Sequence, residues 1–218
     1  MFKKFLLIIL VVLFCFSTAC SKQSALLPYV SELRLDVYEG TSDDYHLKAN
    51  FGYHEKLKNH DGKVSEKTYC LAIILVDCNL DGKISATIEL NGEKFTQEFV
   101  YNPVSSKMIA VFPTDAVPKT FDVIISHNGQ SQTVTLNSTV PENAISYKKA
   151  LESFESQQPA LIQNYTVNGA FIGEIAMRII VKDGAPYWYL GLIDSNGKTK
   201  ALLIDGTNGN ILAIKDVF

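Results

Sequence analysis

The sequence predicts a mainly β protein, in which an immunoglobulin-like β-sandwich is followed by a small α+β module. Apolar and polar residues alternate along many short segments of residues 29–139, a pattern typical of strands with one buried face. Turn residues such as Asn91-Gly92 separate these segments. After residue 140 the apolar spacing changes to that of a helix, and alternation then returns. We therefore expect two structural parts, residues 29–139 and 140–218.

Composition and charge indicate a folded protein that does not bind nucleic acid. The 218 residues are 47 % hydrophobic and 20 % charged, whereas a disordered chain has fewer apolar residues and more net charge. Without residues 1–19, which hold two lysines and no acid, 18 basic residues remain against 23 acidic ones, a net charge of −5. A mildly acidic chain without a basic block argues against a nucleic-acid partner and against a polybasic membrane patch.

Residues 1–19 have the pattern of a secretory signal. Lys3 and Lys4 precede twelve apolar residues, and small residues then lead to Cys20. Twelve helical residues are too short to cross a hydrocarbon core of roughly 30 Å. The small residues before Cys20 resemble a bacterial lipoprotein signal, in which the segment is cleaved before the cysteine and the cysteine is acylated, for example with palmitate.

This resemblance implies that Cys20 carries a lipid and that the protein is held to the cell membrane or the outer membrane, on the extracytoplasmic side. An ordinary cleaved signal peptide with an incidental Cys20 is the alternative. Residues 20–28 are expected to form a short tether. A short tether predicts that the sandwich lies nearer the membrane and that residues 140–218 project outward.

About eight short strands are expected in residues 29–139. They cover residues 33–37, 45–53, 69–76, 84–90, 95–101, 108–112, 121–125 and 134–136. Asn91-Gly92 and Asn128-Gly129 predict tight hairpins, because both central positions of such a turn need φ above zero. Short strands with turn signals between them favour an immunoglobulin-like sandwich, although the Cys…Trp…Cys spacing of true immunoglobulin domains is absent from the sequence.

A helix over residues 142–157 opens the second part. Thr139 and Glu142 have the spacing of a capping box, and Pro159 ends the helical pattern. The residues that recur on one helix face are Tyr147, Leu151 and Phe154. Four strand-like segments follow, at residues 171–181, 187–190, 201–204 and 211–214. The helix and an antiparallel four-stranded meander together make a compact α+β module.

The end of the chain carries a recognisable turn. Asp205 precedes Thr207 and Gly209, and an apolar strand follows. An Asp in a turn accepts hydrogen bonds from backbone amides, and a Gly supplies a left-handed position. With the helix at Ala150-Leu151 and the aromatic strand at residues 186–189, this ending resembles the PepSY domain family. The resemblance implies a module that binds or restrains a partner protein and does not catalyse a reaction.

Residues 77–84 contain the sharpest local motif, which resembles the first half of a calcium-binding loop. Asp77, Asn79 and Asp81 stand two residues apart before Gly82, as in the first half of a calcium-binding loop. The twelfth position, which should supply a bidentate carboxylate, is Ile88, and the flanking segments have the pattern of strands. A polar hairpin turn is therefore the favoured interpretation and calcium the weaker one. We expect no metal and no cofactor.

The aromatic run Tyr187, Trp188 and Tyr189 is the candidate contact site. Neighbouring residues of a strand point to opposite faces, so at least one of the three faces outward, where aromatic residues often mark an interface. The alternative is that this strand fills the core under the helix.

No nucleophile with its base, phosphate loop or zinc spacing occurs in the sequence, so we expect no enzyme. The expected function is a lipid-anchored binding protein that contacts a protein or peptide through its C-terminal module. A structural lipoprotein of an envelope complex is the alternative, and a hydrolase is the weakest interpretation.

Overall fold

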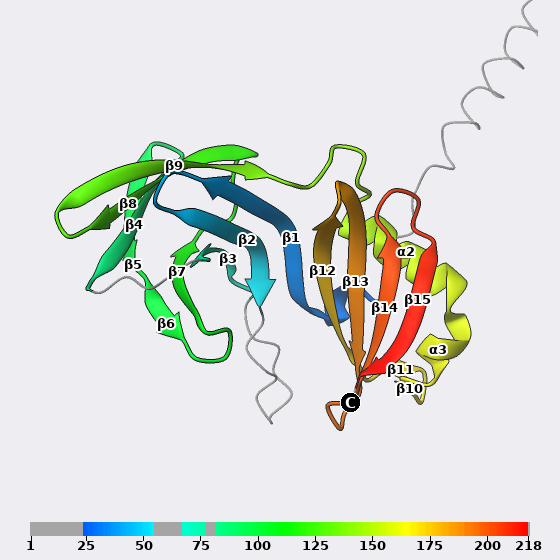
Figure 1. Cartoon of the computed structure of the whole chain (residues 1–218). Helices are drawn as coiled ribbons and strands as arrows, with labels where there is room; N and C mark the ends of the chain where they lie inside the picture. The colour runs from blue at the N-terminus through cyan, green and yellow to red at the C-terminus, as the bar shows by residue number, and fades with distance from the viewer. Residues whose placement is uncertain (1–23, 55–66, 77–81, 218) are drawn as a thin grey trace, which may run out of the picture.

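Thirteen strands form one hydrogen-bonded network in the computed structural model, which describes residues 24–54, 67–76 and 82–217 (Figure 1). Strands make up 59 % of the described residues, which confirms the predicted mainly β class. In the described ranges no helix is both long and apolar enough to cross a bilayer.

The first part of the chain is sandwich-like, with two layers of strands around one core. One layer runs in the order β1 (Val30–Thr41), β2 (His46–His54), β3 (Tyr69–Leu75), β7 (Lys107–Pro113) and β6 (Val100–Asn102). The other runs in the order β9 (Gln130–Ser138), β8 (Thr120–His127), β4 (Ile84–Leu90) and β5 (Glu93–Glu98). Tyr38 and Glu39 at the end of β1 pair with β9 and so connect the layers. Alternating apolar residues of both layers, such as Leu47, Ile73 and Val123, form the core.

The two Asn-Gly turns of the first part have the backbone conformation that the sequence predicts. Asn91 and Gly92 have φ of 54° and 81°, and Asn128 and Gly129 have φ of 51° and 77°. Both tight hairpins are therefore confirmed, joining β4 to β5 and β8 to β9. The segment expected as one strand over residues 95–101 is two strands, because β5 pairs with β4 and β6 pairs with β7. The buried Phe99 lies at the point where the chain changes layer.

In the second part, a four-stranded meander carries helices on one face. Its strands pair antiparallel in chain order: β12 (Glu174–Lys182), β13 (Ala185–Ile193), β14 (Thr199–Asp205) and β15 (Ile211–Val217). Figure 1 shows the helices α2 (Tyr147–Gln157) and α3 (Pro159–Gln163) behind these strands. A short hairpin, β10 (Thr166–Val167) and β11 (Ala170–Phe171), leads from α3 into β12. Ala150, Leu151 and Phe154 of α2 are fully buried against the sheet.

The helix begins later than the predicted residue 142. Ser146 is the N-cap of α2, and its hydroxyl oxygen accepts a hydrogen bond from the Lys149 amide at 3.3 Å. The Thr139 hydroxyl instead donates to the backbone oxygen of Val37 at 3.1 Å and ties the connection to β1. The capping box predicted from Thr139 and Glu142 is therefore wrong, although Leu151 and Phe154 do form the buried face.

Strand β1 belongs to both parts of the molecule. Its first half pairs in parallel with β12, with Val30 beside Ile175 and Leu33 beside Met177. Val30 and Leu33 are buried in the core beneath α2, while Tyr38 further along β1 is buried in the sandwich core. The division of the chain near residue 140 therefore does not coincide with the division between the two cores.

The N-terminal end of the described chain packs on the second part. The Leu26 amide donates to the Glu155 carboxylate of α2 at 3.1 Å, and Leu26 is buried in the core beneath that helix. A 3₁₀ turn, η1 (Leu27–Tyr29), then leads into β1, with the Tyr29 ring against Phe171 at 4.8 Å. The described residues before β1 therefore contact the second part of the chain, and the expected position of the sandwich nearer the membrane stays a prediction.

Candidate functional site

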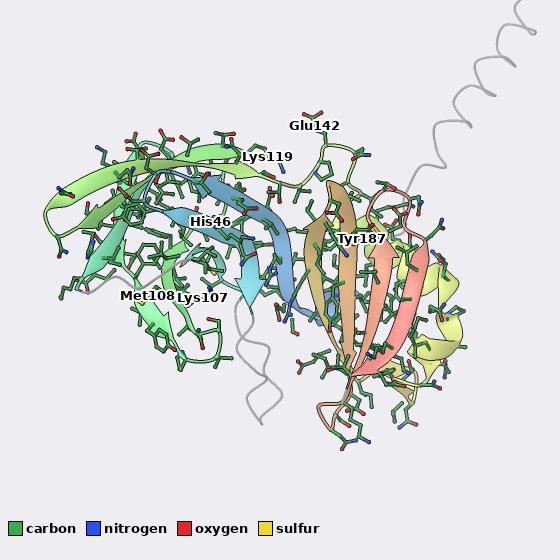
Figure 2. The ribbon with its side chains drawn as sticks, in the orientation of Figure 1. His46, Lys107, Met108, Lys119, Glu142 and Tyr187 are labelled. Atoms are coloured by element: carbon green, nitrogen blue, oxygen red, sulfur yellow. The ribbon has the colours of Figure 1, made fainter. Side chains whose placement is uncertain are left out.

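The two faces of the meander differ in what covers them. Residues of one face, such as Trp188, Leu190 and Leu202, are buried beneath α2. The opposite face is partly open to solvent, and Figure 2 shows Tyr187 on the side of β13 turned toward the viewer, away from the helices. We call this surface the open face and define it by Glu32 and Arg34 of β1, Arg178 and Ile180 of β12, Tyr187 and Tyr189 of β13, and Leu203 of β14.

The structure separates the three aromatic candidates. Trp188 is 3 % exposed, and its indole N–H donates to the backbone oxygen of Ile145 at 2.9 Å. Trp188 is therefore wrong as a contact residue, because strand alternation turns it into the core. Tyr187 and Tyr189 are partly exposed on the open face and remain candidates. Tyr187 lies beside Ile180, which is 39 % exposed, so the two make a small apolar surface.

A bidentate ion pair lies beside Tyr189. Arg178 donates from Nε to Glu32 Oε1 at 2.6 Å and from Nη2 to Oε2 at 2.8 Å. This fork arrangement fixes both side chains, and it raises the pKa of the Arg178 guanidinium. The guanidinium carbon of Arg178 lies 5.6 Å from the centre of the Tyr189 ring, which adds a cation–π contact. The parallel pairing of β1 with β12 brings these residues together.

Arg34 is the register neighbour of Arg178 across the same strand pair. These are the two arginines of the sequence, among twenty basic residues. Burial lowers the pKa of Arg34 and the charge of Arg178 lowers it further, while Glu32 acts in the opposite direction. In the part of the chain that the structure describes, Arg34 makes no hydrogen bond or ion pair, so its five donors are available.

Small residues next to Tyr189 determine the shape of the open face. Gly191 lies between Ala176 and Ala201 in register, so three adjacent strands carry almost no side chain there. A Cβ atom at Gly191 would lie 3.0 Å from the Tyr189 hydroxyl oxygen and 3.1 Å from its Cε1. The Tyr189 ring therefore lies over Gly191, and a side chain at that position would displace it.

The turn at Asp205 has the structure that the sequence predicts. Oδ1 of Asp205 accepts hydrogen bonds from the Thr207 hydroxyl at 2.6 Å, the Thr207 amide at 2.8 Å and the Asn208 amide at 3.2 Å. These bonds, the Thr207 hydroxyl first, lower the pKa of Asp205. Gly209 has φ of +80°, as expected.

This turn is fastened to the helix. The Gln157 amide group donates to the backbone oxygen of Gly209 at 2.9 Å, and its oxygen accepts from the Ile211 amide at 3.2 Å. The Ile145 amide donates to the backbone oxygen of Gly206 at 2.7 Å. Asp205 and Gly209 therefore hold α2 on the sheet, which is a structural role.

Two predicted sites lie outside the described residues. These are Cys20, the predicted lipidation site, and the weak calcium candidate at Asp77, Asn79 and Asp81. Gly82, the next residue of that motif, is described and has φ of +101°. Among the described residues no group of three His, Cys, Asp or Glu side chains is arranged to hold a metal ion.

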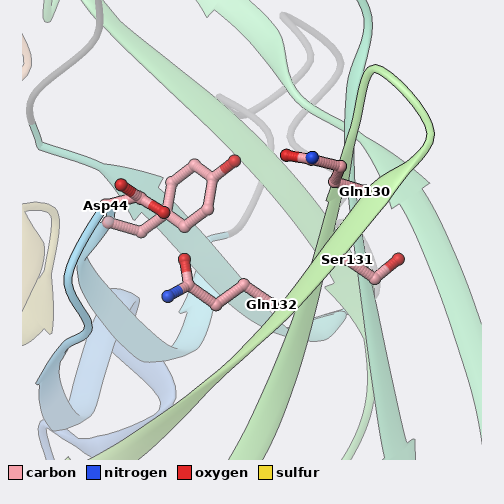
Figure 3. A pocket seen from close by; sticks show the side chains of 5 residues that line it. Asp44, Gln130, Ser131 and Gln132 are labelled. Carbon is pink, nitrogen blue, oxygen red and sulfur yellow. The ribbon is translucent and has the colours of Figure 1, made fainter.

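A polar hollow of about 420 Å³ lies on the sandwich (Figure 3). It is lined by Asp44, Tyr45, Gln130, Ser131 and Gln132. The Gln132 side-chain oxygen is buried there without a hydrogen-bond partner among the described residues. The hollow offers polar groups but no basic side chain, and none of its lining residues is a predicted site residue.

Comparison with known proteins assigns no family to the chain. No family model matches it, and no curated protein and no solved structure matches it. Sequence reasoning missed Glu32, Arg34 and Arg178 as site residues. The scarcity of arginine was the one available signal, since nothing in the strand pattern indicates that residues 34 and 178 are neighbours.

Proposed function

We propose that this protein is a lipid-anchored extracytoplasmic binding protein that contacts a partner protein through the open face. The observation that carries the proposal is the open face itself, where two tyrosines, Ile180 and a fixed ion pair share a sheet surface. Interfaces concentrate their energy in tyrosine and arginine residues that are held rigidly by their neighbours.

The path of the chain supports this use of the surface. Ser24 is the fourth residue after Cys20, which limits the distance between them to about 14 Å. Ser24 and Leu26 lie on the side of the meander covered by α2. A lipid on Cys20 would therefore bring the helix side toward the bilayer and turn the open face away from it, toward a partner.

The finer features of the fold agree with a binding role. We interpret the two layers of the first part as an immunoglobulin-like sandwich, an architecture common in extracellular proteins. We interpret α2 with β12–β15 as a PepSY-like module, on the strength of the Asp205–Gly209 turn. Modules of that family are thought to bind or restrain partner proteins.

A second candidate function is a structural role in an envelope assembly. Strand β15 is hydrogen-bonded on one side by β14 and ends the sheet. Leu212, Ile214 and Val217 on this strand are 51 %, 43 % and 47 % exposed. An apolar edge strand is a template for pairing with a strand of another chain.

Site-specific photo-cross-linking in intact cells distinguishes these functions. A photoreactive phenylalanine replaces Ile180 on the open face or Ile124 on strand β8 of the sandwich, which are 39 % and 37 % exposed, and in a third variant it replaces Ile214 on β15. We expect a discrete adduct with one partner protein from position 180 and none from position 124. Equal adducts from both positions would contradict the proposal, and an adduct from position 214 alone would favour assembly through β15.

The lipid is tested separately. Cys20→Ala should abolish incorporation of a labelled fatty acid and release the protein from the membrane fraction, because stable anchoring requires acyl chains. Equal labelling of the variant and the wild type would show that Cys20 does not carry the lipid.

A further inference from the structure

We propose that Arg34 and Arg178 form a binding site for a carboxylate group of the partner, supplied by an acidic side chain or a chain terminus. This inference rests on the proposed function, because it assigns a chemistry to the contact made by the open face. The arginine pair offers one guanidinium that makes no ion pair with any described residue, and one that Glu32 already orients.

The two arginines lie side by side in the pairing of β1 with β12. Like charges on neighbouring residues of adjacent strands are destabilising. This chain otherwise uses lysine for its basic residues, yet it places its two arginines side by side. Arginine differs from lysine in its planar fork, which matches the two oxygens of a carboxylate. The pairing therefore fits recognition of an oxyanion better than solubility.

The charges of this cluster do not balance among the described residues. Two guanidinium groups face one carboxylate, Glu32, whose two oxygens are both used by Arg178. Among the residues that the structure describes, no carboxylate is therefore hydrogen-bonded to the partly buried Arg34. A bound carboxylate would supply the missing negative charge and relieve the repulsion between Arg34 and Arg178.

The surroundings favour a protein carboxylate over a lipid phosphate. Tyr189 and Leu203 continue the row of Arg34 and Arg178 across the sheet, and Ile180 and Tyr187 form the neighbouring row. An acidic residue flanked by apolar side chains would match this arrangement. The described start of the chain lies on the helix side of the sheet, opposite these residues, which separates the site from the anchoring bilayer.

Arginine side-chain NMR gives a direct test, because the sequence predicts two Nε–Hε signals for the whole protein. The full-length protein in detergent micelles is titrated with sodium acetate, sodium phosphate and sodium chloride at equal ionic strength. We expect acetate to shift the Arg34 signal saturably and chloride not to shift it. Because the two guanidinium groups are neighbours, acetate should also shift the Arg178 signal, and Arg34→Lys, which keeps the charge but not the fork, should abolish that shift. Glu32→Gln should strengthen acetate binding severalfold, because a competing carboxylate is removed.

Two results would overturn the carboxylate site. One is an Arg34 signal that acetate shifts no more than chloride does, and the other is saturation by phosphate at lower concentrations than acetate, which would indicate a phosphate ligand. Lys83→Gln provides the matched control, since Lys83 forms an exposed ion pair with Glu98 at 3.2 Å on the sandwich and should leave the titration unchanged.

Cross-linking separates this inference from the proposed function. The adduct from position 180 should fall about tenfold or more in the Arg34→Lys background, since charge-assisted hydrogen bonds contribute strongly to binding. An unchanged adduct would overturn the carboxylate site and leave the open-face contact standing. If position 180 gives no adduct even when Arg34 is unchanged, the open-face contact itself is overturned.

Discussion

Leu33 lies beside Met177 in the parallel pairing of β1 with β12, so a residue from the first part of the chain completes the core of the second. Leu33 is 2 % exposed and Met177 is fully buried. The sheet therefore continues from the sandwich into the meander through one shared strand. Because β1 serves both cores, we expect the described parts of the chain to unfold together.

Leu33→Ala and Leu47→Ala test this coupling, one in each core. Each substitution should cost about 2–5 kcal/mol, because it leaves a cavity at a buried site. Trp188, the one tryptophan of the sequence, reports on the core beneath α2 by its fluorescence. Leu47→Ala should shift the fluorescence transition in urea as far as the circular-dichroism transition. If Leu47→Ala moves the circular-dichroism transition alone, the two parts unfold independently.

Trp188→Ala should destabilise the protein by about 3–5 kcal/mol, since it removes a large core side chain. Trp188→Phe keeps most of the volume and should cost less, although it leaves the Ile145 carbonyl without its 2.9 Å hydrogen bond. The control is Tyr187→Ala on the neighbouring open-face position, which should change the free energy of unfolding by about 1 kcal/mol or less. Equal costs at positions 187 and 188 would contradict the burial difference between them.

Gly209→Ala should lower stability by more than about 1 kcal/mol, because a left-handed position strains any other residue. A Cβ atom there would also collide with the Ser153 hydroxyl of α2. Gly184→Ala is the matched control, since Gly184 has φ of +76° but no atom within 4 Å of an added Cβ. We expect the larger drop in melting temperature at position 209. Equal drops would show that contact between the turn and α2 adds nothing to the cost of the substitution.

Asp205 should make stability depend on acid pH. Its folded-state pKa is lowered, chiefly by the Thr207 hydroxyl, so its contribution is present above the unfolded pKa and is lost as pH falls through the folded pKa. Asp205→Asn should therefore lower the melting temperature more at pH 7 than at pH 3. Thermal melts of the wild type and the variant at the two pH values check this. If the two proteins differ in melting temperature by the same amount at pH 7 and pH 3, the ionised carboxylate is not the source of the stabilisation.

The parts of the fold that local chemistry decides could be predicted from the sequence. Asn91-Gly92 and Asn128-Gly129 make the expected hairpins, and Asp205 and Gly209 make the expected turn, because each depends on residues a few positions apart. The start of α2 was harder to predict, since several residues before it can cap a helix and tertiary bonding uses Thr139 elsewhere.

Contacts between distant segments could not be predicted in this way. Periodicity shows which residues of a strand share a face, but it does not show that β1 pairs with β12. The arginine pair depends on that pairing and was therefore missed. Strand alternation does assign Trp188 to one face and its two neighbours to the other, but the position of α2 decides which face is buried.

The central claim is that the open face contacts the partner, and the most direct test is the affinity of the partner recovered by cross-linking. Ile180→Asp and Ile124→Asp place the same charge at positions of nearly equal exposure, 39 % and 37 %, on the open face and the sandwich. Both variants should keep the wild-type melting temperature within a few degrees. We predict that Ile180→Asp raises the dissociation constant at least about tenfold and that Ile124→Asp leaves it unchanged. Equal affinity of the two variants would contradict the claim.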